Sequence, residues 1–164
     1  MKNFKLAPIS QILIALFVAT LFAAGVAKAQ PAVPFKATIA ITESIQLIGG
    51  APCFLQGDIS GTGRATHLGK LTLASTDCIN PISATAFSFF SDQVILTAAS
   101  GDQIFAAYSG TFTIEGTVGV IVGGYQITGG TGRFTQASGA GTVQGVEDLS
   151  TGNGEIKLIG TISF

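Results

Sequence analysis

The stretch "YQITGGTGRFTQASGAGTVQG", residues 125–145, is rich in glycine and bears directly on the fold. Such a stretch either cradles a phosphate group or forms turns and close strand contacts. A P-loop needs a lysine six residues after its first glycine, but counted from Gly124 that position is Gly130. The dinucleotide pattern G-x-G-x-x-G also fails, because Thr135 stands three residues after Gly132. We therefore interpret the stretch as turns and strands.

Elsewhere, apolar and polar residues alternate with the period of two that is typical of half-buried strands. Three segments show this most clearly, at residues 36–48, 102–116 and 154–164. Their shared apolar faces hold Ala37, Ile39, Ile41, Ile45 and Leu47, then Ile104, Tyr108, Phe112 and Ile114, then Ile156, Leu158, Ile162 and Phe164. After residue 29 no segment has the apolar period of a helix. The pattern indicates an all-β domain, either a closed barrel or a sandwich.

Glycines favour the barrel. Turn signals separate the strand segments at Gly49, Ser91, Ser100, Gly123 and Thr151. Other glycines interrupt the strand segments themselves: Gly61, Gly63, Gly110, Gly141, Gly145 and Gly160. A glycine inside a strand often marks a bulge or a tight bend, as in the wall of a small barrel. We predict a single closed antiparallel barrel of about eight strands over residues 30–164.

The first 29 residues have the pattern of a helical secretory signal peptide. Lys2 and Lys5 precede an apolar stretch, residues 12–22, and an Ala-x-Ala motif ends at Ala29. A retained membrane anchor is the alternative, but the uncharged run is shorter than the roughly 20 residues of a spanning helix. We expect cleavage near Ala29, secretion to the periplasm or the outside, and no membrane span afterwards.

The chain that remains, residues 30–164, carries five basic and nine acidic residues, a formal net charge of −4. It has no cluster of lysine and arginine, so the sequence offers no electrostatic footprint for nucleic acid. The two cysteines, Cys53 and Cys78, both lie in this part of the chain. In an exported protein such a pair most simply forms one disulfide, which we predict here.

The glycine-rich half of the chain resembles a known family. "YQITGGTGRFTQASG", with its Gly129–Gly132 turn and Phe134, is similar to the glycine turn between two late barrel strands of allene oxide cyclases and dirigent proteins. "SGDQIFAAYSGTF" is similar to the preceding strand, and together with "GRATHLGKLT" it resembles the exported bacterial proteins grouped as allene-oxide-cyclase-barrel-like. The resemblance covers residues 100–164 and, less closely, 57–76. It implies an eight-stranded antiparallel barrel with a partly apolar interior.

The family's functions are expectations only, because one fold hosts many functions. The interior of the plant cyclases binds a fatty-acid epoxide and steers its cyclisation, whereas dirigent proteins steer radical coupling. The cyclases also use a glutamate in the pocket. The residues that flank Glu43 here differ from theirs, so that role is not transferred to Glu43.

Glu43 is nevertheless the leading candidate for chemistry. Alternation places it on the apolar face between Ile41 and Ile45, where loss of solvent would raise its pKa. The alternatives are a bulge at Glu43–Ser44, or a position near the barrel mouth with an arginine partner. If the barrel is hollow, we expect it to bind a small apolar ligand with one polar end. The predicted binding residues are Glu43, Tyr108, Ile41, Ile104 and Phe112, with Ile39 nearby.

Other polar residues have structural interpretations. The only histidine, His67, is expected to form hydrogen bonds at a turn, and a lone histidine does not predict a metal site. Tyr125 is expected to pack beside the glycine turn. Arg64 and Arg133 both follow Gly-Thr-Gly, which suggests two equivalent barrel turns. No metal or other cofactor is predicted.

Three functions remain open from the sequence. The barrel binds a small apolar molecule, which we favour, or it is a cyclase or isomerase of a lipid-like or polyene substrate. The third is a surface or matrix interaction protein whose barrel is filled by side chains. Oligomerisation is left open.

Overall fold

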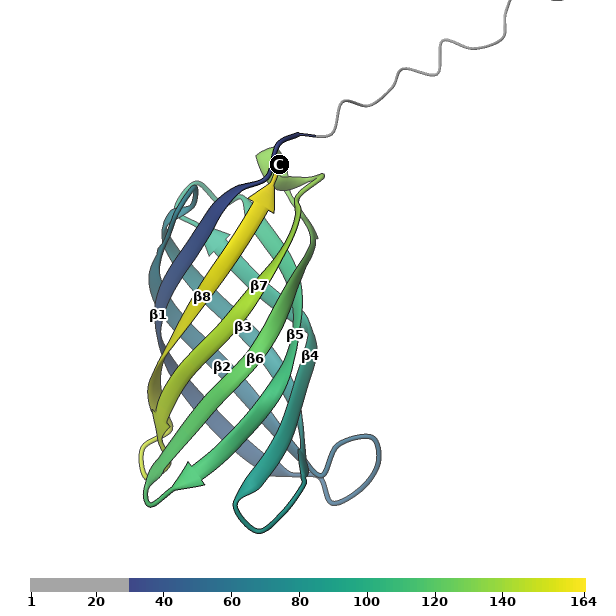
Figure 1. Ribbon diagram of the computed structural model, residues 1–164, viewed down its shortest axis with the longest axis vertical. Coiled ribbons are helices and arrows are strands. Elements are labelled where there is room, and N and C mark those ends of the chain that lie inside the picture. Colours follow the sequence, from purple (N-terminus) through teal and green to yellow (C-terminus); the bar gives the residue numbers. More distant parts are fainter. Residues whose placement is uncertain (1–29) are drawn as a thin grey trace, which may run out of the picture.

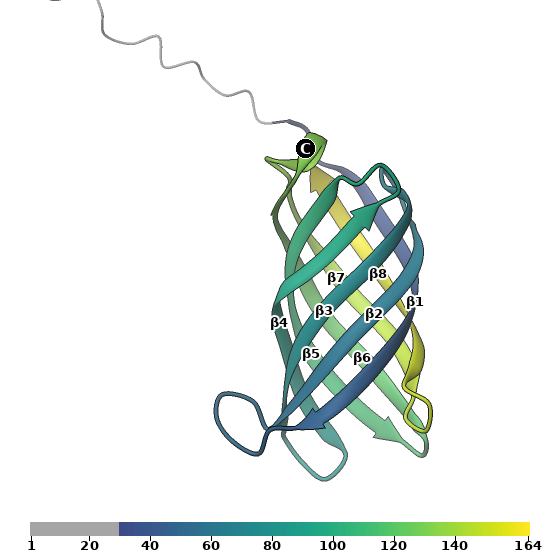
Figure 2. The ribbon, with the colours of Figure 1, turned by 180° about the vertical axis from the view of Figure 1, so that it is seen from behind.

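A computed structural model describes residues 30–164, and the predicted signal peptide, residues 1–29, lies outside the described residues. Eight antiparallel strands close into one barrel in their sequence order, with β8 paired to β1 (Figures 1 and 2). The strands are β1 (Val33–Leu47), β2 (Leu55–Ala65), β3 (Gly69–Pro81), β4 (Ala86–Ala98), β5 (Gln103–Glu115), β6 (Val118–Gly130), β7 (Ser138–Asp148) and β8 (Asn153–Ser163). The predicted all-β barrel is confirmed.

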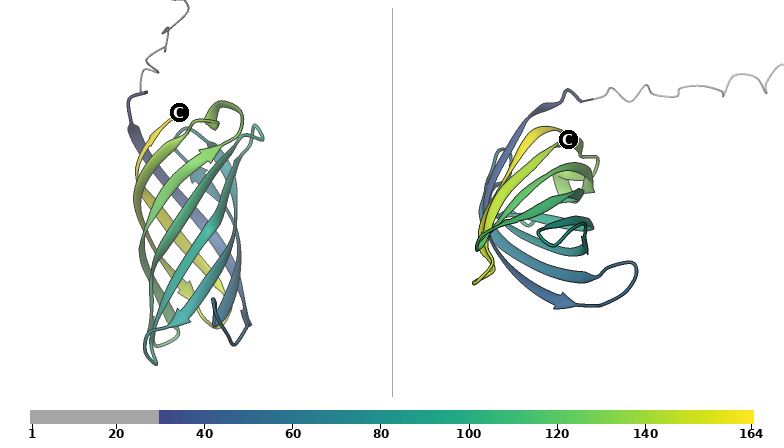
Figure 3. Two further views of the ribbon diagram at one scale, coloured as in Figure 1. Left: turned by 90° about the vertical axis from the view of Figure 1, so that its right-hand side faces the viewer. Right: turned by 60° about the horizontal axis from the view of Figure 1, so that its bottom comes forward.

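The two ends of the barrel differ. One end, which we call the terminal end, holds the start of β1 and the end of β8 (Figure 1). We call the opposite end the mouth; it holds the β1–β2, β3–β4, β5–β6 and β7–β8 connections. The right-hand view of Figure 3 shows the mouth tilted toward the viewer. The longest connection at the mouth, residues 48–54, projects sideways from the barrel (Figure 3).

The terminal end is closed by aromatic and aliphatic side chains. A short 3₁₀ helix, η1 (Gly132–Phe134), follows β6 and places Phe134 there, fully buried together with Phe35 and Ile162. The rings of Phe134 and Phe164 lie 5.0 Å apart. Within residues 30–164 no helix is long and apolar enough to span a membrane.

The predicted strand glycines all lie inside strands, and at every one of them neighbouring groups approach too closely for a side chain. Gly141 of β7 and Gly160 of β8 are paired, and both face the ring of Tyr125. A Cβ at these positions would lie 2.7 and 2.6 Å from the Tyr125 hydroxyl oxygen. The glycine pair therefore makes room for a buried tyrosine in a narrow barrel.

Three turn predictions are wrong. Ser91 lies within β4, where a bulge shifts the register between Ser91 and Val94. Gly123 lies within β6, opposite Gly110 of β5. Arg64 lies in strand β2 whereas Arg133 lies in η1, so they do not mark equivalent turns. Polar residues and glycines here form bulges and close contacts inside long strands. The same residue types also end strands in turns, so a local sequence pattern cannot tell the two cases apart.

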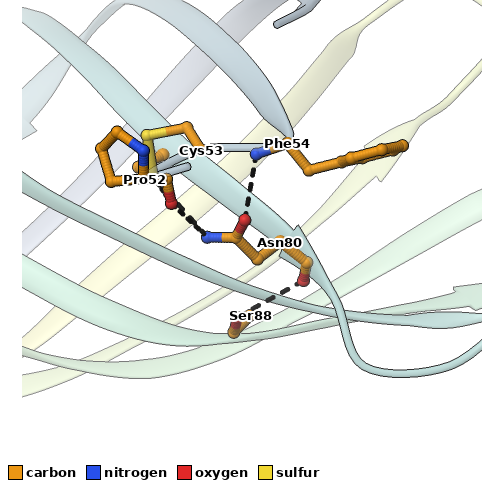
Figure 4. The surroundings of a disulfide bond; sticks show 6 residues. Pro52, Cys53, Phe54, Asn80 and Ser88 are labelled. Carbon is orange, nitrogen blue, oxygen red and sulfur yellow. Dashed lines mark hydrogen bonds between the residues drawn. A yellow bond between two sulfur atoms is a disulfide. The ribbon is translucent and has the colours of Figure 1, made fainter. Parts of the chain in front are cut away.

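The predicted disulfide is present. Cys53, in the β1–β2 connection, is bonded to Cys78 of β3, with the Cα atoms 5.0 Å apart. Beside it, the Asn80 amide donates to the Pro52 carbonyl (3.1 Å) and accepts from the Phe54 backbone N–H (3.0 Å; Figure 4). The covalent bond and the amide together fasten the connection to the barrel wall at the mouth.

Candidate functional site

A cavity of about 190 Å³ occupies the mouth half of the barrel. Every strand contributes to it, because inward-facing side chains recur at every second residue. Its wall is formed by Ile41, Glu43, Ile45, Leu55, Ile59, Asp77, Ile79, Phe87, Phe89, Tyr108, Phe112, Ile114, Ile121, Val143, Leu149 and Ile156. Ile45 is 48% exposed, so the cavity reaches solvent at the mouth. The mouth also exposes Leu47 and Ile82, which makes the approach apolar.

The structure brings most of the predicted site residues together. Glu43, Tyr108, Ile41 and Phe112 all line this cavity. Ile104 does not, because it lies deeper in the fully buried core, as does Ile39. These two positions share the inward face of their strands, but they lie nearer the closed end.

A hydrogen-bonded group lies in one wall of the cavity. Asp77 is buried and accepts hydrogen bonds from the Tyr108 hydroxyl (2.5 Å) and the Ser75 hydroxyl (2.7 Å) on the same oxygen. Burial raises the pKa of Asp77 to about 6, against the lowering effect of the two donors. Burial and the Asp77 carboxylate also raise the pKa of Tyr108 above its usual range. Near neutral pH this arrangement is an ionised carboxylate that two hydroxyl groups satisfy.

A second acidic group joins Glu43 of β1 to Glu147 of β7. Burial raises the pKa of Glu43 to about 9, and a hydrogen bond and charge repulsion from Glu147 add to the effect. Burial also raises the pKa of Glu147, whereas the hydrogen bond from Glu43 lowers it. The directions describe a protonated Glu43 that donates to the Glu147 carboxylate, so the pair holds one proton near neutral pH.

Glycines surround this carboxyl pair. Strand β8 runs between β1 and β7, and its Gly154 has no side chain to separate the two glutamates. A Cβ at Gly154 would lie 3.2 Å from the Glu147 Cβ. On the other side, a Cβ at Gly57 of β2 would overlap the Glu43 carboxylate oxygen. The pair thus fits because two neighbouring strands leave space for it.

Of the alternatives for Glu43, the bulge is wrong, and the position near the mouth is correct but without an arginine partner. The β1–β2 register continues through Glu43 opposite Ile59 without a bulge. The charged group beside Glu43 is another acid, Glu147, rather than an arginine. Prediction from the sequence also missed Asp77 and Glu147, each of which has one apolar inward neighbour, Ile79 or Leu149, and one small neighbour, Ser75 or Gly145. The signal is therefore weaker there than at Glu43, which has isoleucine on both sides.

The remaining candidates lie away from the cavity. His67 lies in the β2–β3 turn at the terminal end, where its Nε2 is 3.1 Å from the Pro34 carbonyl oxygen, as expected for a structural role. Arg133 donates to the His67 carbonyl oxygen and stacks on Phe134. Tyr125 is buried in the middle of β6, and its hydroxyl has no hydrogen-bond partner.

The polar side chains of the cavity can exchange protons and accept hydrogen bonds. Within residues 30–164, no group of three or more histidine, cysteine, aspartate or glutamate side chains is arranged to hold a metal ion. Comparison with known proteins adds no assignment, since no family model and no curated protein matches the chain.

Proposed function

We propose that this protein is an exported small barrel that binds a small apolar molecule in the mouth cavity. The observation that supports it best is the cavity itself, which combines an almost wholly apolar wall with a few acidic and hydroxyl groups. Small-molecule sites commonly have this composition. A barrel that served only as an interaction surface would have no need of an internal space.

The size of the cavity limits the ligand. An engineered apolar cavity of about 150 Å³ accommodates benzene. A cavity of about 190 Å³ therefore suits a single ring or a short alkyl chain, with any longer part extending through the mouth. At about 0.8 kcal/mol for each buried CH₂, a six-carbon chain contributes about 5 kcal/mol before the cost of association.

Export is supported by the disulfide and by the pattern of residues 1–29. Structural disulfides form and persist in oxidising compartments, and the Cys53–Cys78 bond ties down a connection at the mouth. We further propose kinship with the allene-oxide-cyclase-barrel-like proteins. The proposal is supported by residues 129–132, which run from the end of β6 into η1 before β7, since the resemblance implies a glycine turn between two late strands.

A cyclase or isomerase is the second candidate, favoured by one observation. A carboxyl group that keeps its proton at neutral pH inside an apolar cavity is suited to general acid catalysis. Catalysis of a polyene or lipid-like substrate would be abolished in Glu43→Gln, whereas binding of an apolar ligand would persist.

Binding is tested with hexan-1-ol, a neutral probe, followed by NMR chemical shifts of the mature protein. We expect saturable shifts at cavity residues with a dissociation constant of about 1 mM. Ile121→Trp fills the cavity and should weaken binding at least tenfold. Val122→Trp, which adds the same side chain to the exposed outer face, is the matched control. Equal binding by the two variants would reject the proposal.

A further inference from the structure

The hydrogen-bonding capacity of the mouth cavity is unevenly used. Asp77 already accepts two hydrogen bonds, from Ser75 and Tyr108. Glu147 is only 3% exposed, and its Oε2 atom has no hydrogen-bond partner. A buried carboxylate oxygen without a donor is costly, and proteins rarely leave one so. Glu43 supplies one hydrogen bond to this carboxylate, so Oε2 is the oxygen of the acid pair that still lacks a donor.

Glu147 faces the barrel interior beside Glu43, although it is not itself part of the cavity wall. Glu147 faces inward on β7, with the same alternation as Val143 and Leu149, which both line the cavity. Its partner Glu43 lines the cavity directly. A ligand in the cavity can thus contact Glu43 directly and, through a shift of that side chain, Glu147.

The groups around the pair are acidic or apolar. Asp77 on β3 and Tyr108 on β5 are the other ionisable side chains of the cavity wall. The charge of Asp77 raises the pKa of Glu43, and Tyr108 lies beside Asp77. The contributions from β2, β4, β6 and β8 are apolar. Among the described residues that line the cavity there is no lysine, arginine or histidine. Lys157 of β8 lies on the outer face, exposed and paired with Glu155.

We propose that the ligand of the mouth cavity is an apolar amine, whose ammonium group donates hydrogen bonds to Glu43 and Glu147 and takes the place of the proton that they share. The inference rests on the proposed function and deepens it by naming the ligand class. The displaced proton passes to solvent, and the alkyl or aryl part of the ligand fills the apolar space.

Other polar ends fit less well. A carboxylate would bring another negative charge beside Asp77 and the acid pair, in surroundings where like charges repel strongly. An alcohol brings one donor and no charge, so it satisfies the Glu147 oxygen without neutralising the carboxylate. An ammonium group brings three donors and a positive charge.

The proposal is tested with three six-carbon probes, hexylamine, hexan-1-ol and hexanoate, titrated by NMR at pH 8. We expect hexylamine to bind at least tenfold more tightly than hexan-1-ol, and hexanoate to bind most weakly. Equal or tighter binding of hexan-1-ol or hexanoate would overturn the amine assignment but leave the binding function standing. Failure of all three to bind would overturn both.

The pH dependence is a second readout. If the ammonium displaces a proton, hexylamine affinity should rise between pH 6.5 and 8.5, by up to tenfold for each pH unit. Hexan-1-ol affinity should stay level over the same range. Hexylamine affinity that is level or falls with pH would contradict the exchange of proton for ammonium.

A variant locates the effect. Glu43→Gln removes the proton exchange and should lower the ratio of hexylamine to hexan-1-ol affinity at least tenfold. Glu115→Gln, at an exposed position at the end of β5, should leave the ratio unchanged. If Glu43→Gln fails to fold, Glu147→Gln serves in its place. If the folded variant keeps the wild-type ratio of hexylamine to hexan-1-ol affinity, the proposal is overturned.

Discussion

Glu43 keeps its proton to about pH 9 because it is withdrawn from water and faces a second acid, Glu147. Asp77, which is more deeply buried than Glu43, has a smaller pKa shift because two hydroxyl groups donate to its ionised form. Two acids in one cavity are thus set to different protonation states near neutral pH. Their hydrogen-bond partners, more than their depth, make the difference.

Glu43 should therefore make the protein less stable as pH rises. Its pKa is about 9 in the folded chain and near 4.5 in the unfolded chain, so the folded state holds the proton more tightly. Its contribution to the free energy of unfolding is greatest below pH 4.5 and is lost as pH rises toward 9. Glu43→Gln should flatten this slope and stabilise the protein at pH 8 by about 1–3 kcal/mol, allowing for its partial exposure.

Urea unfolding at pH 5 and pH 8 measures this effect. The stabilisation should be much smaller at pH 5, because this pH lies close to the unfolded-state pKa of Glu43 and protonating it on folding costs little there. Glu115→Gln is the control, because Glu115 is exposed. A Glu43→Gln variant with the wild-type slope would contradict the protonation assigned to the pair.

Strands β6, β7 and β8 show how glycine shapes a wall of the barrel. Tyr125 of β6 is opposite Gly141 of β7, which is opposite Gly160 of β8. The tyrosine ring covers both glycines and contacts Phe35 edge-on, with ring centroids 6.2 Å apart. One large and two small residues thus fill a row across three strands, between the cavity and the closed end.

Adding a methyl group to this row should destabilise the fold. Gly141→Ala would place its Cβ against the Ile159 carbonyl oxygen and the Tyr125 ring, so we expect a loss of about 1–3 kcal/mol. Gly124→Ala, on the adjacent strand, is the control, because its Cβ would meet no atom closer than 3.5 Å. Thermal unfolding compares the two variants, and equal melting temperatures would refute the crowding.

The whole barrel has a closed terminal end, an apolar cavity at the mouth, and a disulfide that fixes the longest connection beside that mouth. The N-terminus of the barrel lies at the closed end (Figure 1). A leader joined there would leave the mouth free, and its removal would not disturb the cavity.

Export predicts where the mature chain begins. Protein recovered from the periplasm or medium should start at Gln30, with Cys53 and Cys78 oxidised. N-terminal sequencing and thiol titration of the unfolded, non-reduced protein measure both. A mature chain that retains residues 12–22, or two titratable thiols, would contradict secretion through a cleaved signal peptide.

The alternating pattern was sufficient to predict the strand class and the inward direction of Glu43 and Tyr108, because alternation is a local property of each strand. Glycines inside the strands then favoured a barrel over a sandwich. The two cysteines allowed only one intramolecular disulfide. Bulges and close contacts within long strands were mistaken for turns, as at Ser91 and Gly123, because both use small and polar residues.

Only the tertiary structure decided which inward-facing residues meet and where the space lies. Glu43 and Glu147 are far apart in sequence and lie on strands separated by β8, so their contact depends on barrel closure, on the register of three strands and on Gly154. Ile104 has the same inward direction as Tyr108 but lies in the packed core rather than at the cavity. Periodicity specifies the face of a strand on which a side chain lies, whereas depth and neighbours across the barrel follow from long-range pairing.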